Sequence, residues 1–292
     1  MSEKSNTGRQ TSFQKAWDVL LPYLLYYLAY NVAYLILAFL YQTTVQSFGG
    51  VYGQFMDTHA ATVAGAMSGL CMLVGIFPLV PMLKEELRRR GETFGFVRTK
   101  AAHDTEAVTA AGKRCMPGRT AALTVLLALS ASLGLNALLT LTGFADSSQT
   151  YQEVADRQYG VAFAVGLALY GLLSPLAEEV VFRGVIYNRL RRLYNPAVGI
   201  AVSGLFFGAF HGNLVQGVYG ACLGMLMAYL YERSGRFLIP LLFHAVANLA
   251  VYTTARFAGV QEILFTPAGC AVLLGVSAGC VWVERIGNRD SE

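Results

Sequence analysis

Two adjacent carboxylates and an arginine interrupt an otherwise apolar stretch of the sequence. Glu178, Glu179 and Arg183 lie between the apolar run Leu167–Leu176 and Gly184–Ile186. A charged side chain at membrane depth costs about 3 kcal/mol or more, and it usually marks a functional site with a partner nearby. We therefore expect other polar side chains at a similar depth to complete this group.

Few other strongly polar residues fall in apolar segments, and they have helical spacing. Phe207 and His211 are four residues apart, as are His244 and Asn248, so each pair lies on one helix face. A helix rises about 1.5 Å per residue, which puts Glu178, His211 and His244 about 16, 22 and 12 Å from the inner membrane surface. These depths allow the polar residues to converge in one site.

The two carboxylates need separate roles, because neighbours on a helix point about 100° apart. Glu179 and Arg183 are four residues apart and can pair, which favours a buried structural ion pair. Glu178 is then free of the arginine. Beside an imidazole, such a carboxylate is a candidate general base for water. A second structural carboxylate and hydrogen-bonded packing histidines are the alternative reading.

Composition places these residues in a membrane protein. The chain has 292 residues, 55% hydrophobic and only 14% charged, whereas soluble domains have about 25% charged residues. A spanning helix needs about 20 mostly apolar residues, and eight segments qualify, the fifth being short. They are 17–41, 61–83, 120–142, 159–176 running on toward 190, 197–210, 214–231, 237–254 and 264–283. We expect an all-α, polytopic fold with about eight transmembrane helices.

Basic residues orient these spans. With the N-terminus in the cytoplasm, every Lys and Arg falls on the inner side except Arg157 and Arg256, which lie outside, and Arg183, which lies within the membrane. This bias fits the positive-inside rule. The expected location is the cell membrane, with multiple passes and both termini cytoplasmic.

The expected organisation has four parts. A cytoplasmic segment, 1–15, precedes a three-helix region, 16–145, whose basic cytoplasmic loop is 84–119. The segment 159–254 holds the polar residues and is the expected catalytic core, and 264–283 is the last span. The mildly acidic stretch Asp146–Asp156 has the composition of an ordinary outer loop.

Glycines four residues apart follow the fifth and sixth spans. They are Gly204, Gly208 and Gly212, then Gly220 and Gly224. Small residues at this spacing let helix backbones approach closely in a membrane. Such an approach suits a site assembled from different helices, and it equally suits tight packing without chemical consequence.

The ordered motifs resemble those of a known family. Glu178-Glu179-x-x-x-Arg183, Phe207-x-x-x-His211 and His244-x-x-x-Asn248 are similar to the three motifs of the CPBP intramembrane proteases, the CAAX-protease and bacteriocin-processing group, also called the Abi family. Each motif is weakly specific alone. The resemblance covers about 159–254, and the first three spans fit the family's eight-helix form.

The resemblance implies hydrolysis of a peptide bond within the membrane. By analogy, Glu178 activates a water molecule with the help of His211, and His244 and Asn248 stabilise the oxyanion. A well-placed oxyanion donor is worth about 3–4 kcal/mol. Glu179, Arg183 and Phe207 would organise the site. The expected substrate is a hydrophobic or lipidated peptide, cleaved near the cytoplasmic side.

The need for a metal ion stays open in the sequence. Glu178, His211 and His244 form a ligand set like the His/His/Glu of catalytic zinc sites. However, the sequence has no HExxH motif, and three ligands bound to Zn²⁺ would leave the reaction without a base. We favour a glutamate-activated water without metal over a zinc site.

Two other functions remain as alternatives. One is a non-catalytic membrane scaffold or bacteriocin self-immunity protein that retains the family's residues. The other, less favoured, is a proton-coupled transporter, because the two halves of the sequence lack matching broken helices. Besides its peptide substrate, the expected partners are membrane lipids and not nucleic acid. The sequence does not indicate the substrate, the oligomeric state or the host.

Overall fold

Helices make up the ordered architecture. The computed structural model describes residues 11–92 and 118–287, and no strand occurs within those ranges. The helical elements are α1 (Ser12–Phe48), α2 (Gly50–Thr58), α3 (Ala60–Ile76), η1 (Phe77–Leu79), α4 (Val80–Arg89), α6 (Gly118–Leu141), η2 (Ala145–Ser147), α7 (Gln149–Gly160), α8 (Phe163–Ala168), η3 (Leu169–Leu173), α9 (Ser174–Glu179), η4 (Val180–Tyr187), α10 (Asn188–Leu193), α11 (Pro196–Phe210), α12 (Leu214–Ser234), α13 (Leu238–Thr254), α14 (Ala258–Leu264) and α15 (Pro267–Gly287).

Eight apolar helical segments correspond one to one to the predicted spans. In the described part of the chain, six are long and apolar enough to cross a membrane: 12–48, 60–89, 118–141, 163–193, 214–234 and 267–286. The other two, α11 and α13, are apolar but only 15 and 17 residues long. The predicted all-α, polytopic membrane fold is confirmed.

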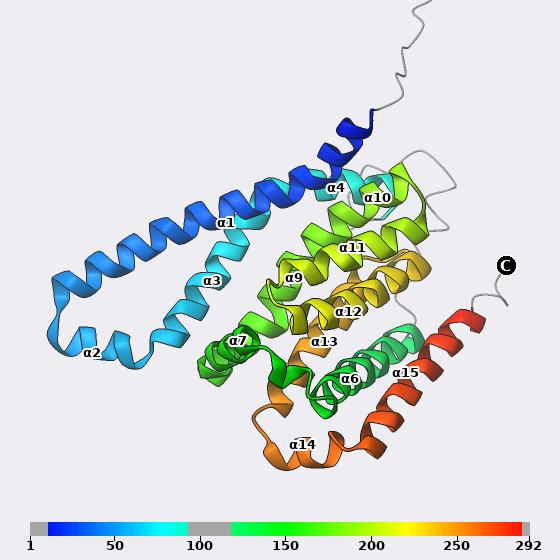
Figure 1. Ribbon diagram of the computed structural model, residues 1–292. Coiled ribbons are helices and arrows are strands. Elements are labelled where there is room, and N and C mark those ends of the chain that lie inside the picture. The colour runs from blue at the N-terminus through cyan, green and yellow to red at the C-terminus, as the bar shows by residue number, and fades with distance from the viewer. Residues whose placement is uncertain (1–10, 93–117, 288–292) are drawn as a thin grey trace, which may run out of the picture.

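The rod from α8 to α10 is the central helix. It runs without a break from Phe163 to Leu193, and 61% of its most apolar window is buried, against 11% for α1 and for α15. It contacts α3 on one side and α11 and α13 on others (Figure 1). Pro175 does not interrupt this helix, because it lies in the first turn of α9, directly after the π-helical segment η3.

Helices α11 and α12 form a hairpin with an unusually close contact. Asn195 and Asn213 cap their N-termini by accepting hydrogen bonds from Val198 N and Gln216 N. A Cβ added at Gly208 would lie 2.3 Å from the carbonyl oxygen of Gly217, so only glycine fits there. The glycine spacing therefore reflects direct backbone contact between the two helices.

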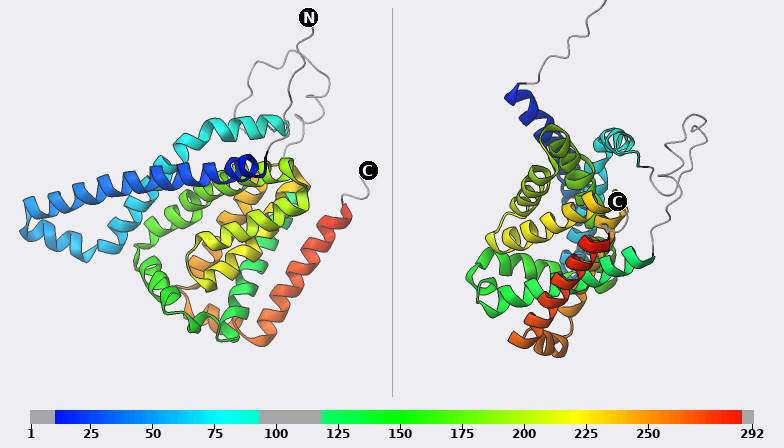
Figure 2. Two further views of the ribbon diagram at one scale, coloured as in Figure 1. Left: turned by 45° about the horizontal axis from the view of Figure 1, so that its top comes forward. Right: turned by 90° about the vertical axis from the view of Figure 1, so that its right-hand side faces the viewer.

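The remaining helices enclose this centre. Helix α6 packs against α13 and α15, and α1 packs against α3. Helix α1 has 37 residues and is about 55 Å long, so its far half extends beyond the centre with α2 and α3 (Figures 1 and 2). The large apolar side chains on this half are mostly exposed, as expected for a surface that faces lipid.

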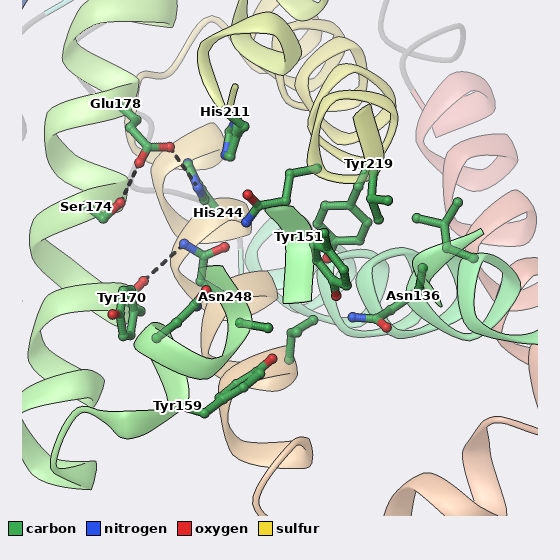
Figure 3. Close-up of a pocket in the computed structure, with 17 residues that line it drawn as sticks. Asn136, Tyr151, Tyr159, Tyr170, Ser174, Glu178, His211, Tyr219, His244 and Asn248 are labelled. Atoms are coloured by element: carbon green, nitrogen blue, oxygen red, sulfur yellow. Dashed lines mark hydrogen bonds and ion pairs between the residues drawn. The ribbon is translucent and has the colours of Figure 1, made fainter. Parts of the chain in front are cut away.

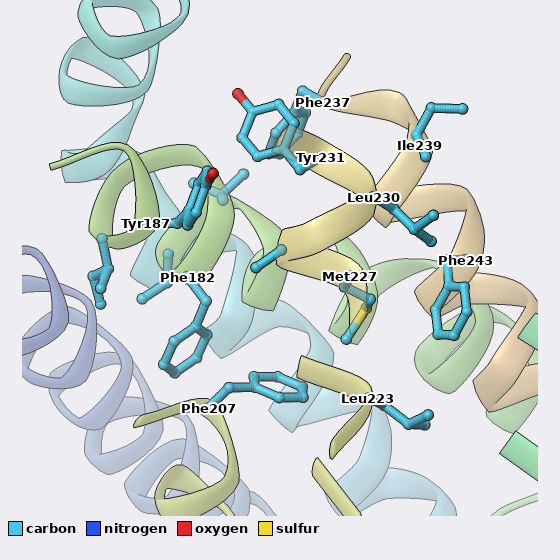
Figure 4. Packing of buried hydrophobic residues seen from close by; sticks show 14 of the residues in the cluster. Phe182, Tyr187, Phe207, Leu223, Met227, Leu230, Tyr231, Phe237, Ile239 and Phe243 are labelled. Carbon is cyan, nitrogen blue, oxygen red and sulfur yellow. The ribbon is translucent and has the colours of Figure 1, made fainter. Parts of the chain in front are cut away.

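The apolar core lies between the central helix and the α11–α13 unit. Phe182 and Tyr187 of η4 pack with Phe207 of α11, Met227 of α12 and Phe243 of α13, all at most 3% exposed (Figure 4). This core fixes the positions of the helices that carry the polar residues.

Two predicted loop segments differ from the structure. The segment Asp146–Asp156, interpreted as an ordinary loop, lies mostly in η2 and α7. Ser148 caps α7 by accepting a hydrogen bond from Tyr151 N. A serine at this position favours the start of a helix, which the mildly acidic composition of the segment does not indicate. The predicted loop 84–119 begins as helix α4 and ends in the first turn of α6. Its part 93–117, like residues 1–10 of the predicted N-terminal segment 1–15, lies outside the described residues.

Candidate active site

The two carboxylates of the first motif lie on α9, between two π-helical segments. Segment η3 precedes α9 and η4 follows it. A π-helix holds more residues per turn than an α-helix, and such segments are frequent at functional sites. As a result, Glu178 points into a cavity, while Glu179 is fully buried among neighbouring helices.

Glu179 and Arg183 form the predicted ion pair. Arg183 Nη1 donates to Glu179 Oε1 at 2.9 Å, and neither side chain is exposed. Arg183 Nη2 also donates to the carbonyl oxygen of Gly224 at 3.0 Å, and its guanidinium lies 4.5 Å from the ring centre of Phe207. The arginine therefore joins the central helix to both helices of the α11–α12 hairpin.

Glu179 has a second partner, which motif spacing alone does not indicate. Its Oε1 lies 2.8 Å from His244 Nδ1 on α13. Because an ionised carboxylate only accepts, His244 Nδ1 is assigned as the donor. This hydrogen bond fixes the imidazole, whose Nε2 lies 3.6 Å from Glu178 Oε2 (Figure 3). An Arg183–Glu179–His244 chain thus presents one imidazole nitrogen to Glu178.

Glu178 is free of the arginine but has a neighbour on its own helix. The Ser174 hydroxyl donates to Glu178 Oε1, one turn away. Oε2 remains directed toward His244. One oxygen of the carboxylate is therefore held by the serine, and the other faces the cavity and the imidazole.

His211 and Asn248 border the same cavity from two other helices. His211 follows the last turn of α11, and its Nδ1 lies 2.9 Å from the carbonyl oxygen of Phe207. Since that carbonyl accepts, the neutral ring keeps an unprotonated Nε2. On α13, Asn248 Nδ2 donates to the carbonyl oxygen of Tyr170 at 3.1 Å. Each side chain is oriented by a backbone carbonyl.

The cavity brings all four predicted catalytic residues together. Its volume is about 200 Å³, and Glu178, His211, His244 and Asn248 all line it (Figure 3). The site-organising residues Glu179, Arg183 and Phe207 lie behind this lining; the Phe207 ring meets the His211 and His244 rings edge to face, with centres 5.0 and 5.5 Å away.

Several lining residues were absent from the sequence prediction. They are the polar residues Asn136 on α6, Tyr151, Gln158 and Tyr159 on α7, Tyr170 and Ser174 on the central helix, and Gln216 and Tyr219 on α12. The Ser174-x-x-x-Glu178 spacing was a readable signal for the serine. For the others no signal was available, because nothing in the sequence places α6 or α7 beside the motifs.

The geometry does not favour the predicted metal ligand set. In the described part of the chain, no group of three or more His, Cys, Asp or Glu residues comes close enough to hold a metal ion, so Glu178, His211 and His244 do not form such a group. We therefore derive no step through Zn²⁺.

Comparisons with known proteins agree with the motifs. A family model described as "Type II CAAX prenyl endopeptidase Rce1-like" matches residues 160–250. A Bacillus subtilis (strain 168) protein, named "Putative membrane peptidase YdiL", is 26% identical over 109 residues. That match covers 37% of this chain and 44% of the relative, so less than half of either protein is compared. No solved structure matches the chain.

The matched segment contains all three motifs, from Glu178 to Asn248. The motif residues are thus part of the region that the family defines and not a chance pattern in a membrane protein. Over residues 160–250 the chain is therefore similar to the Rce1-like type II CAAX prenyl endopeptidases, and together with the putative membrane peptidase this supports the predicted resemblance to a CPBP family protease.

Proposed function

We propose that the protein is an intramembrane endopeptidase that hydrolyses a peptide bond in a hydrophobic or lipidated substrate. The observation that carries this proposal is the convergence of Glu178, His211, His244 and Asn248 on one cavity inside the helical bundle. A water-filled cavity is the one place within a membrane where a hydrolytic water and four polar side chains are tolerated together.

The proposed reaction begins with a water molecule between Glu178 and His211. Glu178 removes a proton as the water oxygen attacks the carbonyl carbon of the scissile bond. The unprotonated Nε2 of His211 accepts a hydrogen bond from the same water and orients it. The carbonyl π electrons move to the oxygen and give a tetrahedral oxyanion.

His244 and Asn248 stabilise this oxyanion as hydrogen-bond donors. His244 donates from Nε2, and the 2.8 Å contact between its Nδ1 and Glu179 Oε1 holds the ring in position. The Asn248 amide donates through the N–H that Tyr170 does not engage. The carbon–nitrogen bond then breaks, and Glu178 returns its proton to the leaving amine.

Cleavage of a hydrophobic peptide by the purified protein tests the proposal. Glu178→Gln keeps the size and the Ser174 contact but removes the base, so we expect kcat to fall by about 10²–10⁴. His211→Ala should lower it through loss of water orientation. Glu262→Gln, on exposed α14, is the control and should retain full activity. Mass spectrometry identifies the bond cleaved.

Two outcomes would contradict the proposal. Cleavage that survives Glu178→Gln would remove Glu178 as the base, and no cleavage of any hydrophobic or lipidated peptide by wild-type protein would favour the non-catalytic alternative.

A separate experiment removes any bound metal with a chelator. We expect activity to persist; activity that disappears and returns only with Zn²⁺ would overturn the metal-free mechanism.

A further inference from the structure

The two ends of the helical bundle differ in charge. One end, here called the basic end, is formed by α4, α10 and the C-termini of α12 and α15 (Figure 1). Its described charged residues are the basic Lys15, Lys84, Arg88, Arg89, Arg90, Arg119, Arg189, Arg191, Arg192, Arg233, Arg236 and Arg285, and the acidic Asp18, Glu85, Glu86, Glu92, Glu232 and Glu284. The opposite, acidic end comprises α2, η2, α7 and α14. Its described charged residues are Asp57, Asp146, Glu153, Asp156, Glu262, Arg157 and Arg256. By the positive-inside rule, the basic end is cytoplasmic.

The cavity extends from the motif residues toward the acidic end. Its lining includes Asn136 and Leu139 in the last two turns of α6, Val251 in the last turn of α13, and four residues of α7. Asn136, Leu139 and Val251 lie at the C-terminal ends of α6 and α13, and α7 itself belongs to the acidic end.

Toward the basic end the same site is closed by packed side chains. Val181, Phe182 and Val185 follow the motif carboxylates on the central helix and are at most 1% exposed. Phe243, directly before His244, is fully buried. None of these residues lines the cavity, so the described structure offers the site no route through this core to the cytoplasmic end.

The short helix α11 explains the asymmetry. Its 15 residues span about 22 Å from the basic end, against about 30 Å for the hydrocarbon layer. The turn that carries His211 therefore lies inside the membrane. Above it, α7 covers the cavity and separates it from the outer solution.

Helix α7 has the two faces that such a cover needs. Tyr151, Ala155, Gln158 and Tyr159 share one face and line the cavity, while Glu153, Asp156 and Arg157 are exposed on the other. Helix α7 packs against α3 and α12, and its cavity side chains form the part of this packing that faces the site. A substrate that enters beside α7 replaces these contacts.

The lining also restricts the substrate. Apart from the motif residues, the cavity presents neutral polar groups. They are the amides of Asn136, Gln158 and Gln216 and the phenols of Tyr151, Tyr159, Tyr170 and Tyr219. No Lys or Arg is among the described lining residues. A carboxylate placed there would be desolvated beside the Glu178 carboxylate with no Lys or Arg to pair with, which is unfavourable. Neutral amides and phenols instead match the N–H and C=O groups of a peptide backbone.

From these observations we infer that the cavity receives an uncharged, internal peptide segment from the extracytoplasmic side, past α7. This inference rests on the proposed function and adds to it the side of entry and the class of substrate. It is opposite to the cytoplasmic approach expected from the sequence. It also differs from recognition of a free C-terminus close to the scissile bond.

Cysteine labelling tests the orientation independently of activity. In a variant without the five native cysteines, Asp156→Cys on the exposed face of α7 is compared with Lys84→Cys on α4. We expect a membrane-impermeant maleimide to label Asp156→Cys in intact bacterial cells, and Lys84→Cys only after permeabilisation. The reverse pattern would overturn the inference.

Cleavage by oriented membranes tests the side of entry. An impermeant, quenched fluorescent peptide with an uncharged cleaved segment is added to spheroplasts or to inverted vesicles, with Glu178→Gln membranes as the background. We expect cleavage by spheroplasts alone. Cleavage by inverted vesicles alone would overturn the inference but leave the proposed function intact. No cleavage in either preparation, or in detergent, would contradict the proposed function itself.

A matched pair of peptides tests the substrate class in detergent, where both sides are accessible. One peptide ends three residues after the scissile bond in a free carboxylate, and the other ends at the same place in an amide. We expect kcat/KM to be at least about tenfold higher for the amide, because the cavity lining has no Lys or Arg to pair with the carboxylate and places it beside Glu178. Equal or faster cleavage of the free acid would overturn the inferred substrate class.

Discussion

Glu179 is the residue on which the order of the site depends. Its Oε1 contacts both Arg183 Nη1 and His244 Nδ1, at 2.9 and 2.8 Å. One carboxylate oxygen thus neutralises a buried guanidinium and sets the imidazole ring that faces Glu178. The role expected for Glu179, a structural ion pair, is retained, and it extends to the orientation of His244.

The buried pair leads to a prediction about stability. Arg183→Leu leaves Glu179 buried without its guanidinium and removes the hydrogen bond to Gly224, so we expect the free energy of unfolding to fall by about 3–5 kcal/mol. In the double variant Glu179→Gln/Arg183→Leu the buried charge is absent, and the loss should be smaller. Unfolding followed by circular dichroism in detergent micelles measures both. Equal losses would argue against an energetic coupling between the two side chains.

At the scale of elements, the α11–α12 hairpin determines where His211 lies. The hairpin is held together by backbone contact around Gly208, three residues before His211, which directly follows the end of α11 at Phe210. A change in the separation of α11 and α12 therefore moves the imidazole relative to Glu178. The central helix is less adaptable, since most of its residues from Ser174 to Leu190 are buried.

Two glycines of this hairpin offer a matched test. A Cβ at Gly208 would lie 2.3 Å from the Gly217 oxygen and 2.8 Å from the Ala221 nitrogen, whereas a Cβ at Gly217 meets nothing closer than 3.7 Å. We expect Gly208→Ala to lower the free energy of unfolding by about 1–3 kcal/mol through overpacking, and to reduce peptide cleavage because His211 is displaced. Gly217→Ala should change stability by less than about 0.5 kcal/mol.

The two variants are measured together by unfolding in micelles and by the cleavage assay. Similar behaviour of Gly208→Ala and Gly217→Ala would mean that backbone contact at Gly208 does not position the site. Loss of stability without loss of cleavage in Gly208→Ala would mean that His211 is positioned by other contacts, such as its hydrogen bond to Phe207.

At the scale of the whole molecule, a polar cluster at the basic end ties distant segments together. Glu92, just after α4, accepts hydrogen bonds from the Tyr231 hydroxyl on α12 and from Phe237 N before α13, at 3.2 and 3.3 Å. Arg90 pairs with Glu92 and with Glu232. The segment just after α4 is thus joined to α12 and to the start of α13, the helix that carries His244 and Asn248.

Glu92 makes this connection sensitive to pH. Burial raises the pKa of its carboxyl from 4.5 to about 7, although the neighbouring Arg90 charge and the donated hydrogen bonds oppose the shift. The folded protein therefore binds a proton more tightly than the unfolded chain does. The resulting contribution to stability is complete below pH 4.5 and is lost as the pH rises through about 7.

We accordingly predict that stability falls by up to about 3 kcal/mol between about pH 5 and about pH 8 because of Glu92. Glu92→Gln keeps a neutral, hydrogen-bonding side chain at every pH, so its stability should depend less on pH over this range. Thermal unfolding in micelles at both pH values measures the difference, with Glu262→Gln as the exposed control. Unchanged pH dependence in Glu92→Gln would contradict the prediction.

The sequence by itself determined the apolar helices and the pairing of Glu179 with Arg183. Hydrophobic length predicts a span, because every backbone polar group in lipid must be bonded within its helix. Helical periodicity predicts the Glu179–Arg183 pair, because residues four apart share a face. Both are local properties, and both were readable without knowledge of any neighbouring helix.

Only the tertiary structure decided what the site contacts and where it opens. The bond between Glu179 and His244 joins residues 65 positions apart, and it depends on how far α13 is displaced along the central helix. The π-helical segments beside α9 arise from packing and leave no mark in composition. The placement of α7 over the cavity likewise follows from the short α11. These features depend on the translation and rotation of whole helices against one another, which hydrophobic pattern and spacing do not specify.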